Sequence, residues 1–494
     1  MPDDDPLSLG VSATTGRPLP TLPDEAVTAM LGVSDPNAEL KRMKQKVNLQ
    51  DDVHFGITGE VDANLLEESG WGVIYGQDVS QKVKDALQPL IEHRKQSAHP
   101  FVIYEGATAP QSGDTAEMWL RDRGVRLDVV DPDKGVPFYL LIVASPRSIP
   151  FELQYTLDLY WAVGRLWFDT PEEFRQYADS VIAYERAAQL PTVRKVAMFA
   201  TEHDFDDATQ RFMRNVATPM INGEGVTPSP LGKRQKFALE TFLGDKASKA
   251  TLCDLLLGRA TGGTPSILFS GSHGMQFDDG DPRQAANQGA LVCNDWEGYG
   301  DITENHWFGA GNVPKEAKVH GLIHFFFACH GGGCSALDNF DRTNNEPKRM
   351  APGPFLARLP QGLLAHPGGG ALAVLAHVER AWANSFEGAD RSSQSQGFRD
   401  VLARLMRGDR IGNATDTFNM RWAALSVGLA EKQLALQRGE EIPLKTLGRL
   451  WVARDDARNF IILGDPAVKI ATEKLPVLQG GRQPFAAPGS QPGP

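Results

Sequence analysis

The chain has 494 residues, 41% of them hydrophobic, which is enough for a large buried core spread over two or three domains. Its 62 acidic residues outnumber its 50 basic ones, and the net charge of −12 without a basic cluster argues against nucleic acid or an anionic membrane as a partner. No apolar stretch reaches the roughly 18–20 residues that span a bilayer. The acidic start shows no signal-peptide pattern and there are only four cysteines, so we predict a reducing, cytoplasmic location.

The chain is expected to contain four parts. Residues 1–70 are rich in Pro, Asp and Thr and form an N-terminal extension with a short helix around 37–46. Residues 71–190 alternate strands with helices as a first α/β subdomain, with strands at 71–75, 101–104 and 138–143 and helices at 80–96 and 170–187. Residues 191–475 form the catalytic subdomain, and residues 476–494 form a disordered tail of Pro, Gly and Gln.

Strands are also expected to alternate with helices in the second subdomain. Its expected strands are 193–200, 266–271, 324–328, 370–377 and 460–463, and its expected helices are 397–407 and 415–438. Strands that alternate with helices predict a mostly parallel sheet covered on both faces. The predicted fold class is therefore α/β.

Two of these strands end in reactive side chains. Residues 266–274 read Ser-Ile-Leu-Phe-Ser-Gly-Ser-His-Gly, and residues 324–333 read His-Phe-Phe-Phe-Ala-Cys-His-Gly-Gly-Gly. In open α/β sheets the functional residues follow the carboxyl ends of such buried strands. Neighbouring strands would bring His273 and Cys329 to one edge of the sheet. This pairing predicts a nucleophilic Cys–His site.

Two alternative interpretations concern the same residues. A lone histidine after a strand is often a structural, hydrogen-bonded residue, and a buried cysteine is often an inert small hydrophobic residue. The chemical alternative is a zinc site formed by His320, His324, Cys329, His330 and Cys334. Their spacing lacks the second close pair of a structural zinc site, and two strand residues four positions apart lie about 13 Å apart. We therefore predict no metal and no other cofactor.

Several motifs, in order along the chain, resemble the gingipain-type cysteine peptidases of the caspase-like clan. In that clan the catalytic histidine precedes a glycine and the catalytic cysteine ends an Ala-Cys strand, as in His273-Gly274 and Ala328-Cys329. Further similar segments are Tyr139-Leu-Leu-Ile-Val143 with Ile149-Pro150, Asp158, Gly164-Arg165, Tyr184-Glu185-Arg186, residues 370–382 and Asn459-Phe-Ile-Ile-Leu-Gly-Asp465-Pro466. The resemblance covers roughly residues 71–472 and implies a caspase-like fold of two consecutive α/β subdomains flanked by helices.

The resemblance also implies a cysteine-type endopeptidase. Cys329 would attack the carbonyl carbon, and His273 would protonate the leaving amine and later activate water. The N–H groups of Gly274 and Cys329 would hold the oxyanion, at on the order of 3 kcal/mol per donor. The candidate acid that orients the histidine is Glu152, shortly after Ile149-Pro150.

Cleavage after Arg or Lys is a further implication. In the arginine-specific gingipains an aspartate of the first subdomain lies at the base of the specificity pocket and a tryptophan beyond the nucleophile forms a wall. The matching residues are Asp158 and Trp382. A carboxylate can take a guanidinium in two parallel hydrogen bonds, and an indole adds a cation–π contact.

The expected role is a regulated protease inside a bacterial cell, in a defence or signalling cascade. Its partners would be protein or peptide substrates and an activating or inhibitory protein. Because an unrestrained protease would harm its own cell, we expect residues 1–70, or the loop 338–354, to cover the cleft until cleavage or partner binding. The alternative is an inactive caspase-like adaptor or scaffold, against which the presence of both His273 and Cys329 argues.

Overall fold

The computed structural model describes residues 7–20, 56–225, 227–298, 301–343, 346–388 and 391–477. The short helix expected around 37–46 and nearly all of the expected C-terminal tail lie outside these ranges. Within them, no helix is both long enough and apolar enough to cross a lipid bilayer.

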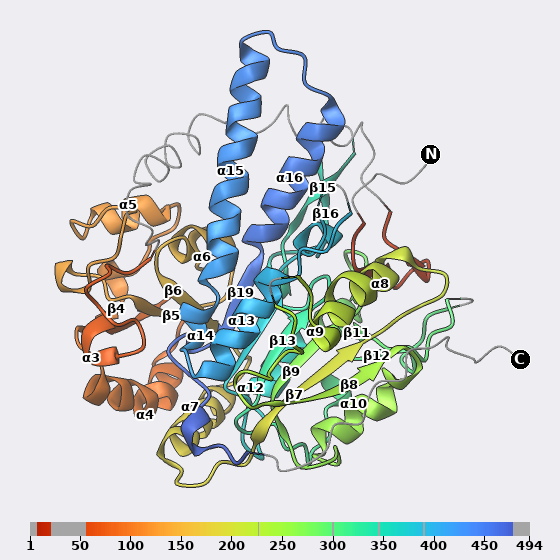
Figure 1. The fold of residues 1–494 in the computed structure, drawn as a ribbon. Helices are drawn as coiled ribbons and strands as arrows, with labels where there is room; N and C mark the ends of the chain where they lie inside the picture. Colours follow the sequence, from red (N-terminus) through yellow and green to blue (C-terminus); the bar gives the residue numbers. More distant parts are fainter. Residues whose placement is uncertain are drawn as a thin grey trace, which may run out of the picture.

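One ten-stranded sheet runs through the molecule (Figure 1). In chain order its strands are β3 (Trp71–Tyr75), β4 (Phe101–Tyr104), β5 (Tyr139–Val143), β6 (Ala162–Leu166), β7 (Val193–Ala200), β8 (Ala238–Leu243), β9 (Pro265–Gly271), β13 (Ile323–Phe327), β18 (Ala373–His377) and β19 (Phe460–Gly464). They lie side by side in the order β4-β3-β5-β6-β19-β18-β13-β9-β7-β8. All neighbours are parallel except β18 and β19. The predicted α/β class with a mostly parallel sheet is confirmed.

The final strand joins the two halves of the sheet. β19 is parallel to β6 of the first half and antiparallel to β18 of the second half. The expected subdomain boundary near residue 190 falls between helix α7 (Pro171–Arg186) and β7, while β19 ties both parts into one continuous sheet.

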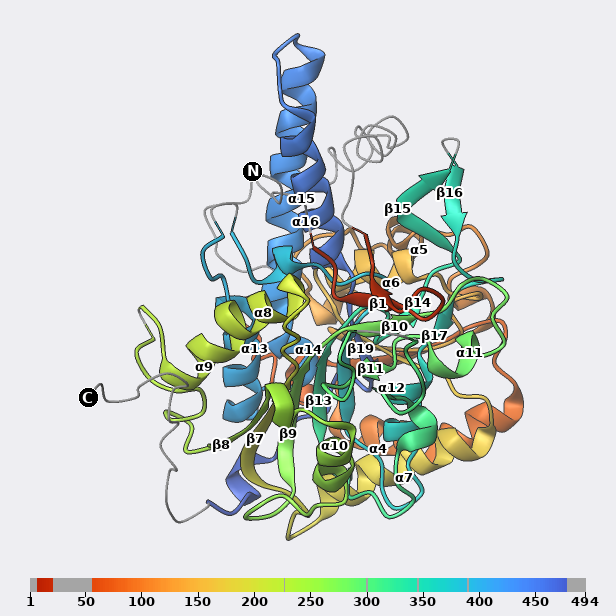
Figure 2. The ribbon, with the colours of Figure 1, turned by 90° about the vertical axis from the view of Figure 1, so that its right-hand side faces the viewer.

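Helices cover the sheet, as the alternating sequence pattern predicts. The longer ones besides α7 are α4 (Gln81–Ser97), α6 (Phe151–Asp158), α10 (Lys249–Leu256), α13 (Gln396–Arg407), α15 (Asp416–Gln437) and α16 (Leu444–Arg458). Helix α7 begins with a capping box, in which Thr170 accepts from the Glu173 N–H and Glu173 accepts from the Thr170 N–H, with Pro171 in the first turn. Helices α15 and α16 pack along each other and extend beyond the body of the molecule (Figures 1 and 2).

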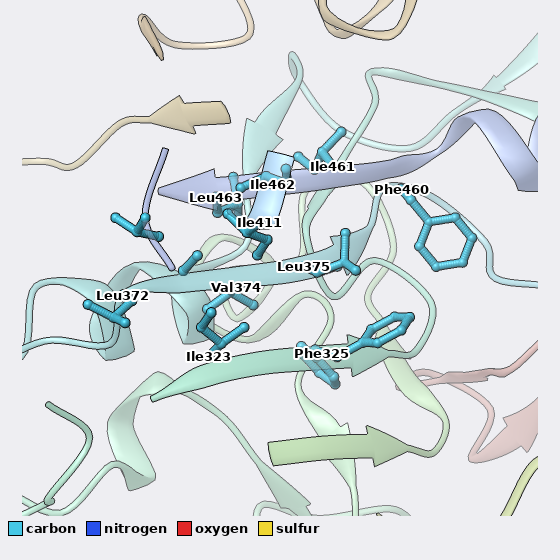
Figure 3. Packing of buried hydrophobic residues seen from close by; sticks show 14 of the residues in the cluster. Ile323, Phe325, Leu372, Val374, Leu375, Ile411, Phe460, Ile461, Ile462 and Leu463 are labelled. Carbon is cyan, nitrogen blue, oxygen red and sulfur yellow. The ribbon is translucent and has the colours of Figure 1, made fainter. Parts of the chain in front are cut away.

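An aromatic core fixes the strand that leads to Cys329. Side chains of β13, β18 and β19 pack together in Figure 3, among them Phe325, Leu375 and Phe460. The rings of Phe325 and Phe327 on β13 contact Phe398 of α13 at centroid distances of 5.5 and 5.1 Å. Alternate residues of a strand face one side, so both rings anchor β13 to the same helix. The residues beyond β13 are thus presented from a rigid base.

A second, five-stranded sheet contains the N-terminal segment. Its order is β12 (Trp307–Phe308), β11 (Leu291–Val292), β10 (Gly274–Gln276), β1 (Gly10–Ser12) and β2 (Arg17–Pro18). β1 is parallel to β10, with Gly10 opposite Gly274 (Figure 2). Residues 7–20 therefore lie directly beside the segment that follows His273.

The loop expected at 338–354 contains regular structure. Strands β15 (Leu337–Thr343) and β16 (Glu346–Arg349) form an antiparallel pair that stands away from the body of the molecule (Figure 2). It is followed by β17 (Phe355–Leu356), which pairs with β14 (Gly333–Cys334) shortly after Cys329.

Candidate active site

The two strand ends predicted to carry the site are neighbours in the sheet. β9 and β13 are parallel with Phe327 opposite Gly271, and the Ser272 N–H donates to the Phe327 carbonyl at 3.2 Å. His273 and Cys329 each follow two residues after this pair. A β-carbon at Gly274 would overlap the Cys329 carbonyl group, so only glycine allows the two backbones to touch.

The Cys329 thiol is buried at the end of β13. Its Sγ accepts a hydrogen bond from the Ala381 N–H at 3.2 Å and lies 3.6 Å from the Ala381 carbonyl oxygen. Burial raises the pKa of Cys329 to about 12. With the site in this state, the sulfur is a neutral thiol near pH 7.

His273 is held by an aspartate that the sequence prediction did not include. Its Nε2 lies 2.7 Å from Oδ2 of Asp206, and both residues are buried. Burial alone would raise the pKa of Asp206, but the charge and hydrogen bond of His273, with a hydrogen bond from the Thr209 N–H, bring it well below its usual value. Nδ1 of His273 has no hydrogen-bond partner among the described residues. The imidazole is thus oriented through one nitrogen and has the other available for chemistry.

Asp206 also begins a helix. It is the N-cap of α8 (Asp207–Phe212) and accepts from the N–H groups of Ala208 and Thr209. This helix follows β7, the strand beside β9. The sequence signal that could have found Asp206 was an acidic cap past the end of a neighbouring strand.

Two N–H groups converge on one carbonyl oxygen. Gly274 and Cys329 donate to the Leu9 carbonyl oxygen at 3.1 and 3.0 Å. The same segment pairs with the chain beyond β18, since the Leu9 N–H donates to Ala381 at 2.7 Å and the Ala383 N–H donates to Leu7 at 2.9 Å. Two backbone N–H groups that share one carbonyl oxygen have the donor arrangement that an oxyanion hole requires.

The other predicted site residues lie in two places. Trp382 is beside the Leu7–Leu9 segment, since its backbone forms an antiparallel bridge with Ser8. Asp158 ends α6, where it accepts from the Val163 N–H at 3.0 Å and burial raises its pKa well above the usual value. Glu152 is exposed in the first turn of α6. Within the described chain neither α6 carboxylate has a hydrogen bond to His273 or Cys329.

The histidines considered for zinc bind separate hydrogen-bond partners. His320 Nε2 lies 3.0 Å from the Ser180 carbonyl oxygen, and His324 Nε2 lies 2.8 Å from Ser270 Oγ. Over the described ranges, no three His, Cys, Asp or Glu side chains gather as a metal site would require.

Comparisons with known proteins identify the family. The profile of Peptidase family C25 matches residues 72–471. Similar solved structures, each 12% identical, are a complex of Porphyromonas gingivalis RgpB pro- and mature domains (81% of this chain, 80% of that one, TM-score 0.47), a structure described as a protease (81% and 78%, TM-score 0.41) and a Saccharomyces cerevisiae separase–securin complex (66% and 15%, TM-score 0.30). No curated protein matches the chain. Because the family profile spans most of its length, the chain belongs to peptidase family C25, a family of cysteine peptidases.

Proposed function

We propose that this chain is a cysteine endopeptidase in which Cys329 is the nucleophile and His273 the general acid and base. The observation that carries the proposal is the Leu9 carbonyl oxygen, which accepts hydrogen bonds from the N–H groups of both Gly274 and Cys329. A pair of backbone donors beside a thiol and an imidazole is the arrangement that acyl transfer needs.

In the proposed mechanism, Sγ of Cys329 attacks the carbonyl carbon of the bound peptide and its proton passes to Nδ1 of His273. The two N–H groups stabilise the negative oxygen of the tetrahedral intermediate. His273 then gives the proton to the leaving amine, and later takes a proton from the water that hydrolyses the thioester.

Asp206 is the proposed positioning residue for His273. Its carboxylate binds Nε2 and stabilises the imidazolium that forms when the thiol loses its proton. This role replaces the one expected for Glu152, for which the contacts described above give no support.

The intact chain is proposed to be latent. The Leu7–Leu9 segment covers the site, with Leu9 fully buried, and leaves Cys329 without exposed surface. Of the two segments expected to cover the cleft, residues 1–70 and the loop 338–354, these contacts favour the N-terminal one. A protein partner could activate the enzyme by displacing the same segment.

Cleavage after Arg or Lys is what the resemblance predicts, and the contacts of Asp158 do not support it. The position of Trp382 beside the bound segment supports a role in substrate binding. The carboxylate of Asp158 instead binds the Val163 N–H and has a raised pKa, which does not favour it as a partner for a substrate guanidinium. A role in a bacterial defence cascade inside the cell likewise stays a prediction.

Active-site labelling tests the proposal against the inactive-adaptor alternative. We expect a peptidyl acyloxymethyl ketone to form a thioether with Cys329 in the full-length wild-type chain and in Cys334→Ala, located by mass spectrometry. The His273→Ala chain should stay unlabelled because the imidazole activates the thiol. Equal labelling with and without His273 would favour the adaptor.

A further inference from the structure

Residues 7–10 cross the site in the manner of a peptide substrate. Leu9 supplies the carbonyl group held by the two N–H donors, and the residues before it pair antiparallel with residues 381–383. Gly10 comes next, and a β-carbon placed there would lie 2.9 Å from Cys329 Sγ. The peptide bond beside the thiol is therefore Leu9–Gly10.

The Leu9 side chain lies in an apolar environment. It has no exposed surface and belongs to the main cluster of buried hydrophobic side chains. Burying a leucine side chain contributes roughly 1.5–3 kcal/mol, whereas burying an unpaired charge is costly. The subsite before the cut bond thus favours an aliphatic residue.

Two buried carboxylates near Cys329 and His273 are already engaged. Asp456 accepts from the Trp382 N–H at 2.9 Å and from Ser385 Oγ at 2.5 Å, and its Oδ1 lies 3.2 Å from His377 Nε2. The carboxylate next to the catalytic imidazole is engaged by that ring. Neither is free to pair with an arginine or lysine that would replace Leu9.

We propose that the Leu9–Gly10 bond is the first substrate of this site, so that the chain cuts itself after leucine and prefers leucine at the same position of other substrates. This inference rests on the proposed function, since it uses the same nucleophile and the same oxyanion donors.

The reaction is an ordinary hydrolysis and needs water as its only co-reactant. Sγ of Cys329 bonds to the Leu9 carbonyl carbon, the bond from that carbon to the Gly10 nitrogen breaks, and the thiol proton leaves on the Gly10 amine through His273. Water then adds its hydroxyl to the Leu9 acyl carbon, the bond from that carbon to Sγ breaks, and the released sulfur takes back a proton. The products are a Leu9 carboxylate and a Gly10 amine.

The cut would open the cleft on one side. Residues 7–9 are held by backbone hydrogen bonds to residues 274, 329, 381 and 383, whereas Val11 stays buried in the small sheet beside β10. A freed nine-residue peptide loses its covalent tether and can leave, while β1 remains paired. The subsites that bind residues before the cut bond then become accessible.

Intact-mass measurements on full-length chains test the inference. We expect the wild type to lose residues 1–9 with time and to show Gly10 as its new amino terminus, whereas Cys329→Ala stays whole. Cys334→Ala is the matched control for Cys329→Ala and should be cut at the wild-type rate, because the Cys334 thiol contacts Gln288 and not the 7–10 segment. Leu9→Arg should be cut at least about tenfold more slowly.

A second measurement uses peptides added to the wild-type chain. Peptides with leucine before the cut bond should show at least about a tenfold higher kcat/KM than matched arginine peptides. The inference is overturned if Leu9→Arg is cut as fast as the wild type, if arginine peptides are preferred, or if the wild-type chain stays whole. A separate assay then tests the peptidase proposal itself. If the wild type still hydrolyses an unfolded protein and Cys329→Ala does not, the peptidase proposal stands. If neither chain hydrolyses it, that proposal is overturned too.

Discussion

At the residue scale, Asp206 links His273 to the start of a helix. The carboxylate binds His273 and accepts from the first N–H groups of α8, so the helix fixes the carboxylate and the carboxylate fixes the ring. An asparagine is as good an N-cap as an aspartate, which separates the two roles experimentally.

Asp206→Asn should therefore lower kcat without unfolding the protein. We expect a fall of roughly 100-fold or more with little change in KM, because the amide lacks the charge that stabilises the imidazolium. Steady-state kinetics and an unfolding curve check this expectation. Glu152→Gln is the control and should keep wild-type kinetics; a large loss there with none in Asp206→Asn would return the orienting role to Glu152.

Glu379 is a second buried acid, and it predicts a pH effect on stability. Burial raises its pKa from 4.5 to about 7, opposed by the charge of Arg458 and reinforced by Asp338 and Asp455. Its carboxylate also accepts from Asn339 Nδ2 at 3.0 Å. Between pH 4.5 and 7 the folded chain binds more protons than the unfolded chain, so the free energy of unfolding should fall as the pH rises.

Glu379→Gln removes this titration. Relative to the variant, the wild type should lose roughly 3 kcal/mol of stability between pH 4.5 and 8. Denaturant unfolding at a series of pH values measures the difference. If the free energies of unfolding of the two chains change with pH in the same way, the pKa of Glu379 is not raised in the folded chain.

At the element scale, the N-terminal segment lies over Cys329 up to Gly10, the first residue of β1. Gly10 has no room for a side chain, because a β-carbon there would lie 2.6 Å from Leu19 Cδ1 and 2.9 Å from Cys329 Sγ. A large residue at this position should force the segment out of the cleft.

Gly10→Phe should therefore expose the thiol. In a His273→Ala background, which prevents cutting, we expect iodoacetamide to alkylate Cys329 at least about tenfold faster when Gly10 is replaced. Peptide mapping by mass spectrometry gives the rates. Gly311→Phe is the matched control, since a β-carbon there meets nothing within 4 Å. If iodoacetamide alkylates Cys329 at the same rate in His273→Ala and in the two double variants, another segment covers Cys329.

Local pattern predicts some elements well and others not at all. The predicted strands 101–104 and 193–200 agree with β4 and β7, and the predicted helix 80–96 agrees with α4 within one residue at each end. Strand β6 was missed because Gly164 and Arg165 interrupt its apolar pattern. Gly164 is needed where the chain approaches Gly464, and the buried Arg165 guanidinium donates to Gln154 Oε1.

The closeness of His273 and Cys329 was predictable from their places just beyond two strand ends. His273 and Cys329 follow apolar runs, so the parallel-sheet rule places them together. Asp206 lies farther beyond the end of its strand, β7, and its signal is only that of an acidic helix cap. Leu9 has no local signal, because it belongs to a segment that pairs with residues more than 260 positions away. Long-range pairing of this kind leaves no periodicity in the local sequence.

At the scale of the whole molecule, a buried ion pair supports the junction of the two sheet halves. Arg94 of α4 donates through Nε to Asp465 at 2.6 Å and through Nη2 to Glu185 at 2.7 Å. Asp465 directly follows β19 and also accepts from Trp71 Nε1 at 3.0 Å. Two of the motifs behind the family resemblance, around Glu185 and Asp465, thus meet in one structural network.

Asp465→Asn should destabilise the fold by about 3 kcal/mol or more, because the buried guanidinium of Arg94 then loses the charge of one of its two carboxylate partners. Asp179→Asn is the control, since its pair with Arg175 is exposed and should contribute less than about 1 kcal/mol. Chemical unfolding of the three chains gives the values. Equal stability of Asp465→Asn and the wild type would mean that the pair does not support the junction.

The central claim is that Cys329 and His273 act as one catalytic unit, and a double-variant cycle tests it most directly. The rate of hydrolysis of an unfolded protein substrate is measured for the wild type, Cys329→Ala, His273→Ala, the double variant and the control Cys334→Ala. We expect each single variant to fall about 10³-fold or more, to the same residual rate as the double variant, and the control to keep wild-type activity. A single variant that retains a rate within tenfold of the wild type, or a loss of activity in Cys334→Ala, would contradict the account.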